Sequence, residues 1–272
     1  MTDGLLALAL EVAREAAALV SERRRGAVSV AATKSSDIDI VTQVDRDSEE
    51  LIRTGIRTAR PDDGFLGEEG HDEPGTSGVR WIVDPIDGTV NFLYDLPQYA
   101  VSVAAEENGV VVAGVVLNVA SGTEYTAVRR TARGGSTTVE SRRDGEPIRV
   151  RGEAPLSQRL VATGFHYVTE TRALQAAAAA RLLPYIRDIR RMGSCALDLC
   201  HVAEGALDAY VEEGVMAWDH AAGGLVAQGA GARIELTRGA GGRELIICAP
   251  EHGFRTFRDA VRDAGFLGVA GE

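Results

Sequence analysis

Apolar residues recur at helical spacing in two stretches near the start of the chain. Residues 3–25 place Leu6 and Leu10 on one face, which predicts an amphipathic helix. Residues 46–60 repeat the pattern, and Pro61 ends this second helix because proline cannot donate the next backbone hydrogen bond. Between the helices, apolar and polar residues alternate only in part, which predicts a loop or an extended hairpin.

Strand-like patterns follow the second helix. Residues 65–67 and 81–83 predict two short buried strands, each followed by carboxylates. Residues 99–128 predict three strands, and the Asn-Gly pair at 108–109 is typical of a tight turn between the first two. Residues 131–145 are rich in Gly, Ser and Arg and lack periodicity, so we expect a loop at a subdomain boundary.

The second half of the chain alternates between strand and helix patterns. Strands are expected at residues 160–165, 186–189, 207–211, 232–236 and 244–249. Helices are expected in the alanine-rich stretch that ends near Pro184 and at residues 194–203, 220–228 and 252–263. This alternation predicts a sheet with helical cover. We therefore expect a mixed α/β fold in a single catalytic domain, 1–272, with an antiparallel-rich subdomain of about 1–145 and an α/β subdomain of about 146–272.

Composition and charge narrow the possible partners. The 272 residues include 29 Lys and Arg against 40 Asp and Glu, for a net charge of −11. Nucleic acid is therefore a poor candidate partner, and an anionic substrate would need metal ions to supply positive charge. Three cysteines are too few for a disulfide framework and favour the cytoplasm. Charged residues interrupt the apolar N-terminus, so neither a secretory signal nor a membrane partner is expected.

The densest group of chemically capable residues is WIVDPIDGTVNF, residues 81–92. An apolar strand runs into Asp84, Pro85 sets a rigid turn, and Asp87 follows. Gly88 permits an unusual backbone angle, and Thr89 is expected to cap a helix whose first N–H groups face an anion. Alone, these residues are equally well explained as a turn and a cap.

Three further acidic positions have the same ambiguity when each is taken alone. Glu68 and Glu69 follow a strand in FLGEEG and fit a solvated turn. Asp219 in AWDHAAGG is expected at a helix N-cap, and Thr42-x-x-Asp45 has the spacing of a capping box. Together, however, carboxylate clusters at strand and helix ends are what a site for several divalent cations requires. Hard oxygen ligands favour Mg²⁺ or Ca²⁺ over zinc.

The segments VTQVD, GEE, DPIDGTVNF and WDHAAG occur in this order between residues of about 34 and 235. They resemble the inositol monophosphatase family of magnesium-dependent, lithium-sensitive phosphatases. The resemblance implies a layered αβαβα sandwich of the sugar-phosphatase type and a homodimer. It also implies about two to three Mg²⁺ ions as cofactors, with Mn²⁺ as a possible substitute and Li⁺ as an inhibitor.

The resemblance also implies roles for individual residues. Glu68, Asp84 and the carbonyl group of Ile86 would hold the first ion. Asp84, Asp87 and Asp219 would hold the second, and Glu68 would help to place a third. Lys34, eleven positions before Asp45, and Glu69 are possible accessory residues.

Further roles concern water and substrate. The resemblance implies that Thr89 and Asp45 orient and deprotonate the attacking water, with Glu68 nearby. The N–H groups of Gly88 and Thr89 would hold the phosphate. The substrate hydroxyls would be contacted by Asp87, Glu212 and the backbone at Gly193, Ser194 and Cys195. Cys195 departs from the family pattern, in which alanine is common.

The metal residues indicate the reaction, whereas the walls of the pocket decide the substrate. Glu212 favours a polyol because a carboxylate accepts hydroxyl protons, so myo-inositol 1-phosphate is the expected small-molecule substrate. Histidinol phosphate, fructose 1,6-bisphosphate, NADP and 3′-phosphoadenosine 5′-phosphate are the alternatives within the resemblance. A non-catalytic regulatory protein on the same fold is the alternative from another class. Arg190 and Arg191 are expected mainly in structural ion pairs.

Overall fold

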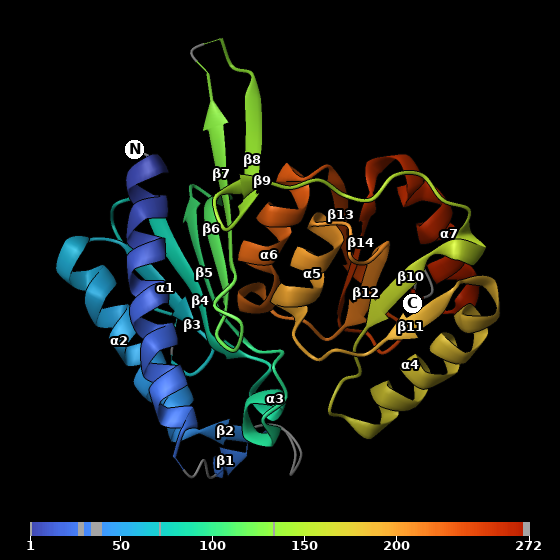
Figure 1. Ribbon diagram of the computed structural model, residues 1–272, viewed down its shortest axis with the longest axis horizontal. Coiled ribbons are helices and arrows are strands. Elements are labelled where there is room, and N and C mark those ends of the chain that lie inside the picture. Colours follow the sequence, from blue (N-terminus) through green and yellow to red (C-terminus); the bar gives the residue numbers. More distant parts are fainter. Residues whose placement is uncertain (1, 27–29, 34–39, 71, 133, 269–272) are drawn as a thin grey trace.

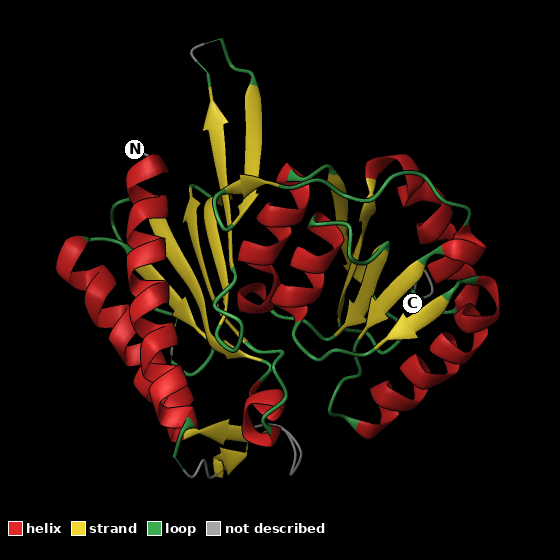
Figure 2. Ribbon diagram, in the orientation of Figure 1, coloured by secondary structure: helices red, strands yellow, loops and turns green. Residues whose placement is uncertain are grey.

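The chain folds into five alternating layers of helices and sheets, αβαβα (Figure 1, Figure 2). The computed structural model describes residues 2–26, 30–33, 40–70, 72–132 and 134–268. Helices α1 (Thr2–Arg24) and α2 (Gln43–Ala59) form one outer layer against a seven-stranded sheet. Helices α5 (Cys195–Ala203) and α6 (Ala217–Gly229) form the middle layer. The expected layered sandwich is thus confirmed.

The seven-stranded sheet follows the chain order from β3 to β9, and all neighbours are antiparallel except β3 and β4. Its strands are β3 (Gly64–Gly67), β4 (Val79–Asp87), β5 (Ala100–Glu107), β6 (Val110–Asn118), β7 (Glu124–Thr131), β8 (Thr137–Arg143) and β9 (Glu146–Pro147). Short helix α3 (Thr89–Tyr94) follows β4. A separate pair is formed by β1 (Val30–Thr33) and β2 (Ile40–Thr42).

The five-stranded sheet lies on the other side of α5 and α6. Its order is β11 (Asp188–Arg190), β10 (Leu160–Thr163), β12 (Ala209–Glu213), β14 (Glu244–Pro250) and β13 (Ala232–Arg238). The first three strands are parallel and the last two pair antiparallel. The outer layer consists of α4 (Thr169–Leu182) and α7 (Phe254–Ala264). Single 3₁₀ turns occur at η1 (Leu156–Gln158), η2 (Leu183–Tyr185) and η3 (Glu251–Gly253).

Small residues allow the middle layer to lie close to the seven-stranded sheet. A side chain at Gly114 of β6 would place its Cβ 3.0 Å from the Cα of Ala222 in α6. A Cβ at Gly223 would lie 2.8 Å from the carbonyl oxygen of Ala196 in α5. The glycines therefore set the separation of α5, α6 and the sheet, because interiors are packed without spare volume.

The structure corrects the expected loop at 131–145. Strand β7 continues to Thr131 and pairs with β8 from Thr137 onward, which forms a hairpin that projects from the fold (Figure 1). Most side chains of β8 are exposed, and Ser141 is its buried residue. Strands that are polar on both faces lack the apolar alternation by which a strand is recognised. Within the described residues, no helix is long and apolar enough to cross a membrane.

Candidate active site

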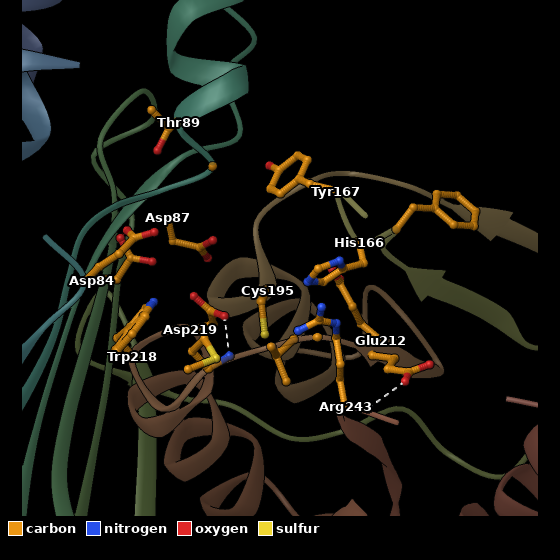
Figure 3. A pocket seen from close by; sticks show the side chains of 18 of the residues that line it. Asp84, Asp87, Thr89, His166, Tyr167, Cys195, Glu212, Trp218, Asp219 and Arg243 are labelled. Carbon is orange, nitrogen blue, oxygen red and sulfur yellow. Dashed lines mark hydrogen bonds between the residues drawn. The ribbon is translucent and has the colours of Figure 1, made fainter. Parts of the chain in front are cut away.

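Residues from both sheets line one cavity of about 880 Å³ (Figure 3). Asp84, Asp87 and Asp219 lie on one side, and His166, Glu212 and Arg243 lie on the other. Ten of the residues expected at a site line this cavity: Glu68, Asp84, Ile86, Asp87, Gly88, Thr89, Gly193, Cys195, Glu212 and Asp219. Positions more than 150 residues apart in the chain are therefore assembled in one place.

Asp84 and Asp87 lie within strand β4, not in a turn after it. The pairing with β5 passes from Asp84 opposite Ser102 to Asp87 opposite Ala100, so β4 carries one extra residue there. Such a bulge tolerates Pro85, which has no N–H to donate to the ladder. One carboxylate oxygen of Asp84 accepts a 3.0 Å hydrogen bond from the N–H of Ile86. On either side of this bulge, both Asp84 and Asp87 line the same cavity.

Gly88 is required where β4 meets α3. Its φ of +95° is in the left-handed region, and a Cβ there would lie 2.8 Å from the carbonyl oxygen of Gln98 and 3.2 Å from that of Gly193. The helix begins at Thr89 and Gly88 is its N-cap, so the expectation that Thr89 itself caps the helix is wrong. The close approach of residue 193 brings the start of α5 against the Asp87 bulge.

Asp87 joins the two halves of the site. Its Oδ2 accepts hydrogen bonds from the Ser194 hydroxyl at 2.6 Å and from the N–H of Ala196 at 2.7 Å. Burial raises the pKa of Asp87, and these hydrogen bonds only partly oppose that increase. Ser194, which is 1% exposed, thus acts on the cavity through Asp87.

Asp219 is the third residue of α6 and not its N-cap, as had been expected. The N-cap is Met216, whose N–H donates a 2.6 Å hydrogen bond to the Asp219 carboxylate. Burial raises the pKa of Asp219 well above its ordinary value, and the nearby carboxylates of Asp87 and Glu68 raise it further. Several carboxylates are therefore buried close together, which is electrostatically unfavourable unless a cation compensates them.

The Thr89 hydroxyl reaches the start of α2. It lies 3.0 Å from Oδ1 of Asp45 and 3.0 Å from the carbonyl oxygen of Ile86. Asp45 is fully buried, and its other oxygen accepts the N–H of Thr42 at 2.9 Å. The capping box that the Thr42-x-x-Asp45 spacing allowed is therefore present. Burial raises the pKa of Asp45 against the opposing hydrogen bonds from Thr42 and Thr89.

Glu212 and Cys195 line the opposite wall. The Tyr210 hydroxyl donates a 2.7 Å hydrogen bond to Oε2 of Glu212, and Gly164 leaves room for that carboxylate. Burial and the nearby carboxylates raise the pKa of Glu212 and hold the pKa of the Cys195 thiol well above its usual range. Cys195 therefore stays a thiol, which is a poor nucleophile.

The other residues named from the sequence differ in their relation to the cavity. Glu69 borders a separate shallow hollow beside α2. Lys34 is outside the described residues. Arg190 pairs with Asp188 at 2.6 Å as expected, but Arg191 lines the cavity and its charge favours the ionised forms of Asp87 and Glu212.

Sequence reasoning missed the basic and aromatic residues of the far wall. These are Phe165, His166, Tyr167, Arg172 and Arg243. For three of them a usable signal was available, because His166 and Tyr167 directly follow the expected strand at 160–165 and Arg243 lies in the glycine-rich connection before β14. Binding residues gather at strand ends.

The chain as a whole is similar to known proteins. A model of the inositol monophosphatase family matches residues 1–256. The chain belongs to the inositol monophosphatase family. It is 44% identical to the inositol-1-monophosphatase SuhB of Mycobacterium tuberculosis, over 92% of this chain and 90% of that protein.

Two further relatives from the comparison bear on structure and function. The crystal structure of the extragenic suppressor protein SuhB of Bartonella henselae matches with a TM-score of 0.83 and 30% identity, over 95% of this chain and 98% of that one. The Nus factor SuhB of Pasteurella multocida is 37% identical over 85% of this chain and 84% of that protein. The family thus contains proteins named for phosphatase activity and proteins named for another role.

Members of the inositol monophosphatase family are metal-dependent, so we tested whether the cavity fits divalent cations. Within the described part of the chain, no three His, Cys, Asp or Glu side chains are grouped closely enough to hold an ion as they stand. The chemistry of the donors does fit, because the four carboxylates Glu68, Asp84, Asp87 and Asp219 line one cavity and two are buried with raised pKa values. The hydrogen bonds from Ser194, Ala196 and Met216 involve one oxygen of each carboxylate, Oδ2 of Asp87 and Oδ2 of Asp219.

Proposed function

We propose that this member of the inositol monophosphatase family hydrolyses a phosphate monoester of a small polyol, most readily myo-inositol 1-phosphate. The observation that carries the proposal is one cavity in which four carboxylates and Thr89 face Glu212, while the Thr89 hydroxyl binds the buried Asp45. The family match and the 44% identity to an inositol-1-monophosphatase support it. The other phosphate esters named above are alternatives. Each would need different contacts between its alcohol group and the far wall of the cavity.

Two sets of ligands would hold magnesium ions. Glu68, Asp84 and the Ile86 carbonyl form one set, and Asp84, Asp87 and Asp219 form the other. Bound Mg²⁺ or Mn²⁺ supplies Lewis-acid charge that neutralises phosphate oxygens and acidifies water. The negative chain can then accept an anionic substrate despite its net charge of −11.

The chain's own groups would position water and substrate. Thr89 can accept a hydrogen bond from a water because its own hydroxyl proton is directed to Asp45 or Ile86. Glu68, on the same cavity wall, would accept a proton from that water. The N–H groups of Gly88 and Thr89 would donate to the phosphate, and Glu212 would accept hydroxyl protons from the polyol. Water attacks directly in this scheme, because Cys195 is buried as a thiol and Ser194 donates to Asp87.

A regulatory role without catalysis is the second candidate. It is favoured by the relative named Nus factor SuhB. Every residue assigned to catalysis or metal binding is present in this chain, so the catalytic proposal explains more of the buried carboxylates than a binding role does.

Assembly as a homodimer, a cytoplasmic location and inhibition by Li⁺ remain parts of the proposal. A monomer mass in light scattering would refute the homodimer.

Phosphate release from a panel of esters tests the proposal. The panel contains inositol 1-phosphate, histidinol phosphate, fructose 1,6-bisphosphate, NADP and 3′-phosphoadenosine 5′-phosphate, each with Mg²⁺ or with a chelator. We expect Mg²⁺-dependent release that is fastest from inositol 1-phosphate and is lost in the Asp84→Asn variant. Equal, slow release by the wild type and Asp84→Asn would favour the regulatory candidate.

A further inference from the structure

We propose that Glu49 of α2 is a positioning residue, which holds the turn at residues 67–70 and thereby fixes Glu68 at the edge of the cavity. The inference rests on the proposed function, because Glu68 is assigned there to metal and water. Glu49 itself does not line the cavity. Its effect on the reaction would be transmitted through the turn.

Both oxygens of the Glu49 carboxylate are engaged in a buried position. The residue is 2% exposed. Its Oε2 accepts a 2.8 Å hydrogen bond from the backbone N–H of Glu69, and its Oε1 accepts a 2.5 Å hydrogen bond from Arg53. A buried carboxylate is tolerated when it is paired in this way, and removing it leaves Arg53 and the Glu69 N–H without this partner.

The position of Glu49 explains why glycines flank Glu68 and Glu69. A Cβ at Gly67 would lie 2.3 Å from Oε2 of Glu49. A Cβ at Gly70 would lie 2.8 Å from Oε1 of Glu49 and 2.3 Å from a guanidinium nitrogen of Arg53. In the segment GEEG, the outer glycines therefore make room for the Glu49–Arg53 pair.

The pair is also fixed to the strand that leads into the turn. The Arg53 guanidinium lies over the ring of Phe65 in β3, 4.8 Å from its centroid. Arg53 is only 13% exposed and also lies 3.6 Å from Glu73, which pairs with Phe65 by backbone hydrogen bonds. The Glu49–Arg53 pair thus contacts both strand β3, through Phe65, and the turn itself, through the Glu69 N–H.

One face of α2 contacts two motif segments of the site, DPIDGTVNF and GEE. Asp45 accepts from Thr89, and the Ser48 hydroxyl donates to the Pro85 carbonyl at 3.3 Å. Glu49 accepts from Glu69. Residues at i, i+3 and i+4 share one side of a helix, so a single rigid element sets the relative positions of the bulge, Thr89 and the Glu68 turn.

Glu49→Ala and Glu49→Gln test the inference against Glu50→Gln as the matched control. Glu50 binds the same Arg53 at 2.9 Å, but its side chain is 65% exposed. In Glu49→Ala we expect about a tenfold or larger loss of Mg²⁺ affinity by calorimetry, with a similar loss of kcat for inositol 1-phosphate. The KM for the ester should change little, and Glu50→Gln should match the wild type in all three. Glu49→Gln, which keeps an acceptor oxygen for Glu69, should lie between the two.

A double-mutant cycle separates positioning from general stability. Gly67→Ala should weaken Mg²⁺ binding strongly in the wild-type background. It should do so much less beside Glu49→Ala, because the carboxylate with which the new methyl group collides is gone. If the losses of Mg²⁺ affinity in Glu49→Ala and Gly67→Ala simply add, the inference about Glu49 is wrong. It is also wrong if folded Glu49 variants bind Mg²⁺ and hydrolyse inositol 1-phosphate as Glu50→Gln does. Either result would leave the proposed function intact. A wild-type protein that neither binds Mg²⁺ nor releases phosphate would overturn the proposed function and, with it, this inference.

Discussion

The Thr89 hydroxyl lies 3.0 Å from the Asp45 carboxylate, although 44 residues separate them in the chain. The hydroxyl proton has two acceptors at this distance, Asp45 and the Ile86 carbonyl, so the lone pairs of the Thr89 oxygen remain directed elsewhere. Under the proposed function, this arrangement would let Thr89 orient a water in the cavity.

Replacing Thr89 by valine should therefore lower kcat by about 100-fold or more, because the water loses its acceptor, while KM changes little. Steady-state kinetics with inositol 1-phosphate measure both constants. Thr89→Ser keeps the hydroxyl and should retain most of the activity. Comparable losses in the serine and valine variants would show that the hydroxyl is not the active feature.

Asp219→Asn should stabilise the metal-free protein while it abolishes Mg²⁺-induced stabilisation. Asparagine keeps an oxygen for the Met216 N–H but removes a buried charge close to Asp87 and Glu68. We expect the metal-free melting temperature to rise by about 2–4 °C, measured by calorimetry in chelator. If Asp219→Asn melts at a lower temperature than the wild type in chelator, groups of the protein itself already stabilise the charge of the Asp219 carboxylate, and the prediction is wrong.

Asp63 should contribute stability that is lost in acid. It accepts hydrogen bonds from Arg60, from the Ser77 hydroxyl at 2.6 Å and from the Trp81 indole at 2.9 Å. Burial alone would raise the pKa of Asp63, but these hydrogen bonds outweigh burial and lower it. Because the folded pKa lies below the unfolded one, the stabilisation is complete above about pH 4 and disappears as the pH falls through the folded pKa.

Urea unfolding of Asp63→Asn measures this contribution. The variant should be less stable than the wild type by about 1–3 kcal/mol at pH 7, with a smaller difference near pH 3. Asp62→Asn provides a control because Asp62 is exposed and accepts with its backbone carbonyl instead. A difference that stays constant between the two pH values would exclude ionisation of Asp63 as its cause.

Glu212→Gln should raise the KM for inositol 1-phosphate by about tenfold and change kcat less. The proposed contacts of Glu212 are with the hydroxyls of the polyol, and the Tyr210 hydroxyl holds one of its oxygens at 2.7 Å. An ester without polyol hydroxyls, such as para-nitrophenyl phosphate, should be much less affected. Equal losses with both esters would remove Glu212 from substrate selection.

Local sequence signals were enough to predict the features that depend on neighbouring residues. The capping box joins Thr42 and Asp45, which are three positions apart, so the local sequence was enough to identify it as one reading. The carboxylates at 68, 84, 87 and 219 were found because each lies next to an apolar or small-residue run in the sequence. Their assembly in one cavity depends on the packing of both sheets, and the prediction of that assembly came from the family resemblance.

Other features could not be predicted from the pattern of apolar and polar residues. The N-cap at Met216 was missed because an N-cap without a side-chain oxygen leaves no signature. Arg243 and His166 reach the cavity from the glycine-rich connection before β14 and the segment after β10. The sequence pattern also did not predict that Glu49 is buried and binds the turn at residues 67–70. The Glu69 N–H that it accepts is about 20 residues away in the chain.

Magnesium binding measured by titration calorimetry tests the central claim most directly. The wild-type protein is expected to bind Mg²⁺ with released or absorbed heat, and Asp84→Asn should bind at least about tenfold more weakly because Asp84 belongs to both proposed ligand sets. Absence of Mg²⁺ binding by the folded wild type, or unchanged binding by Asp84→Asn, would contradict the account.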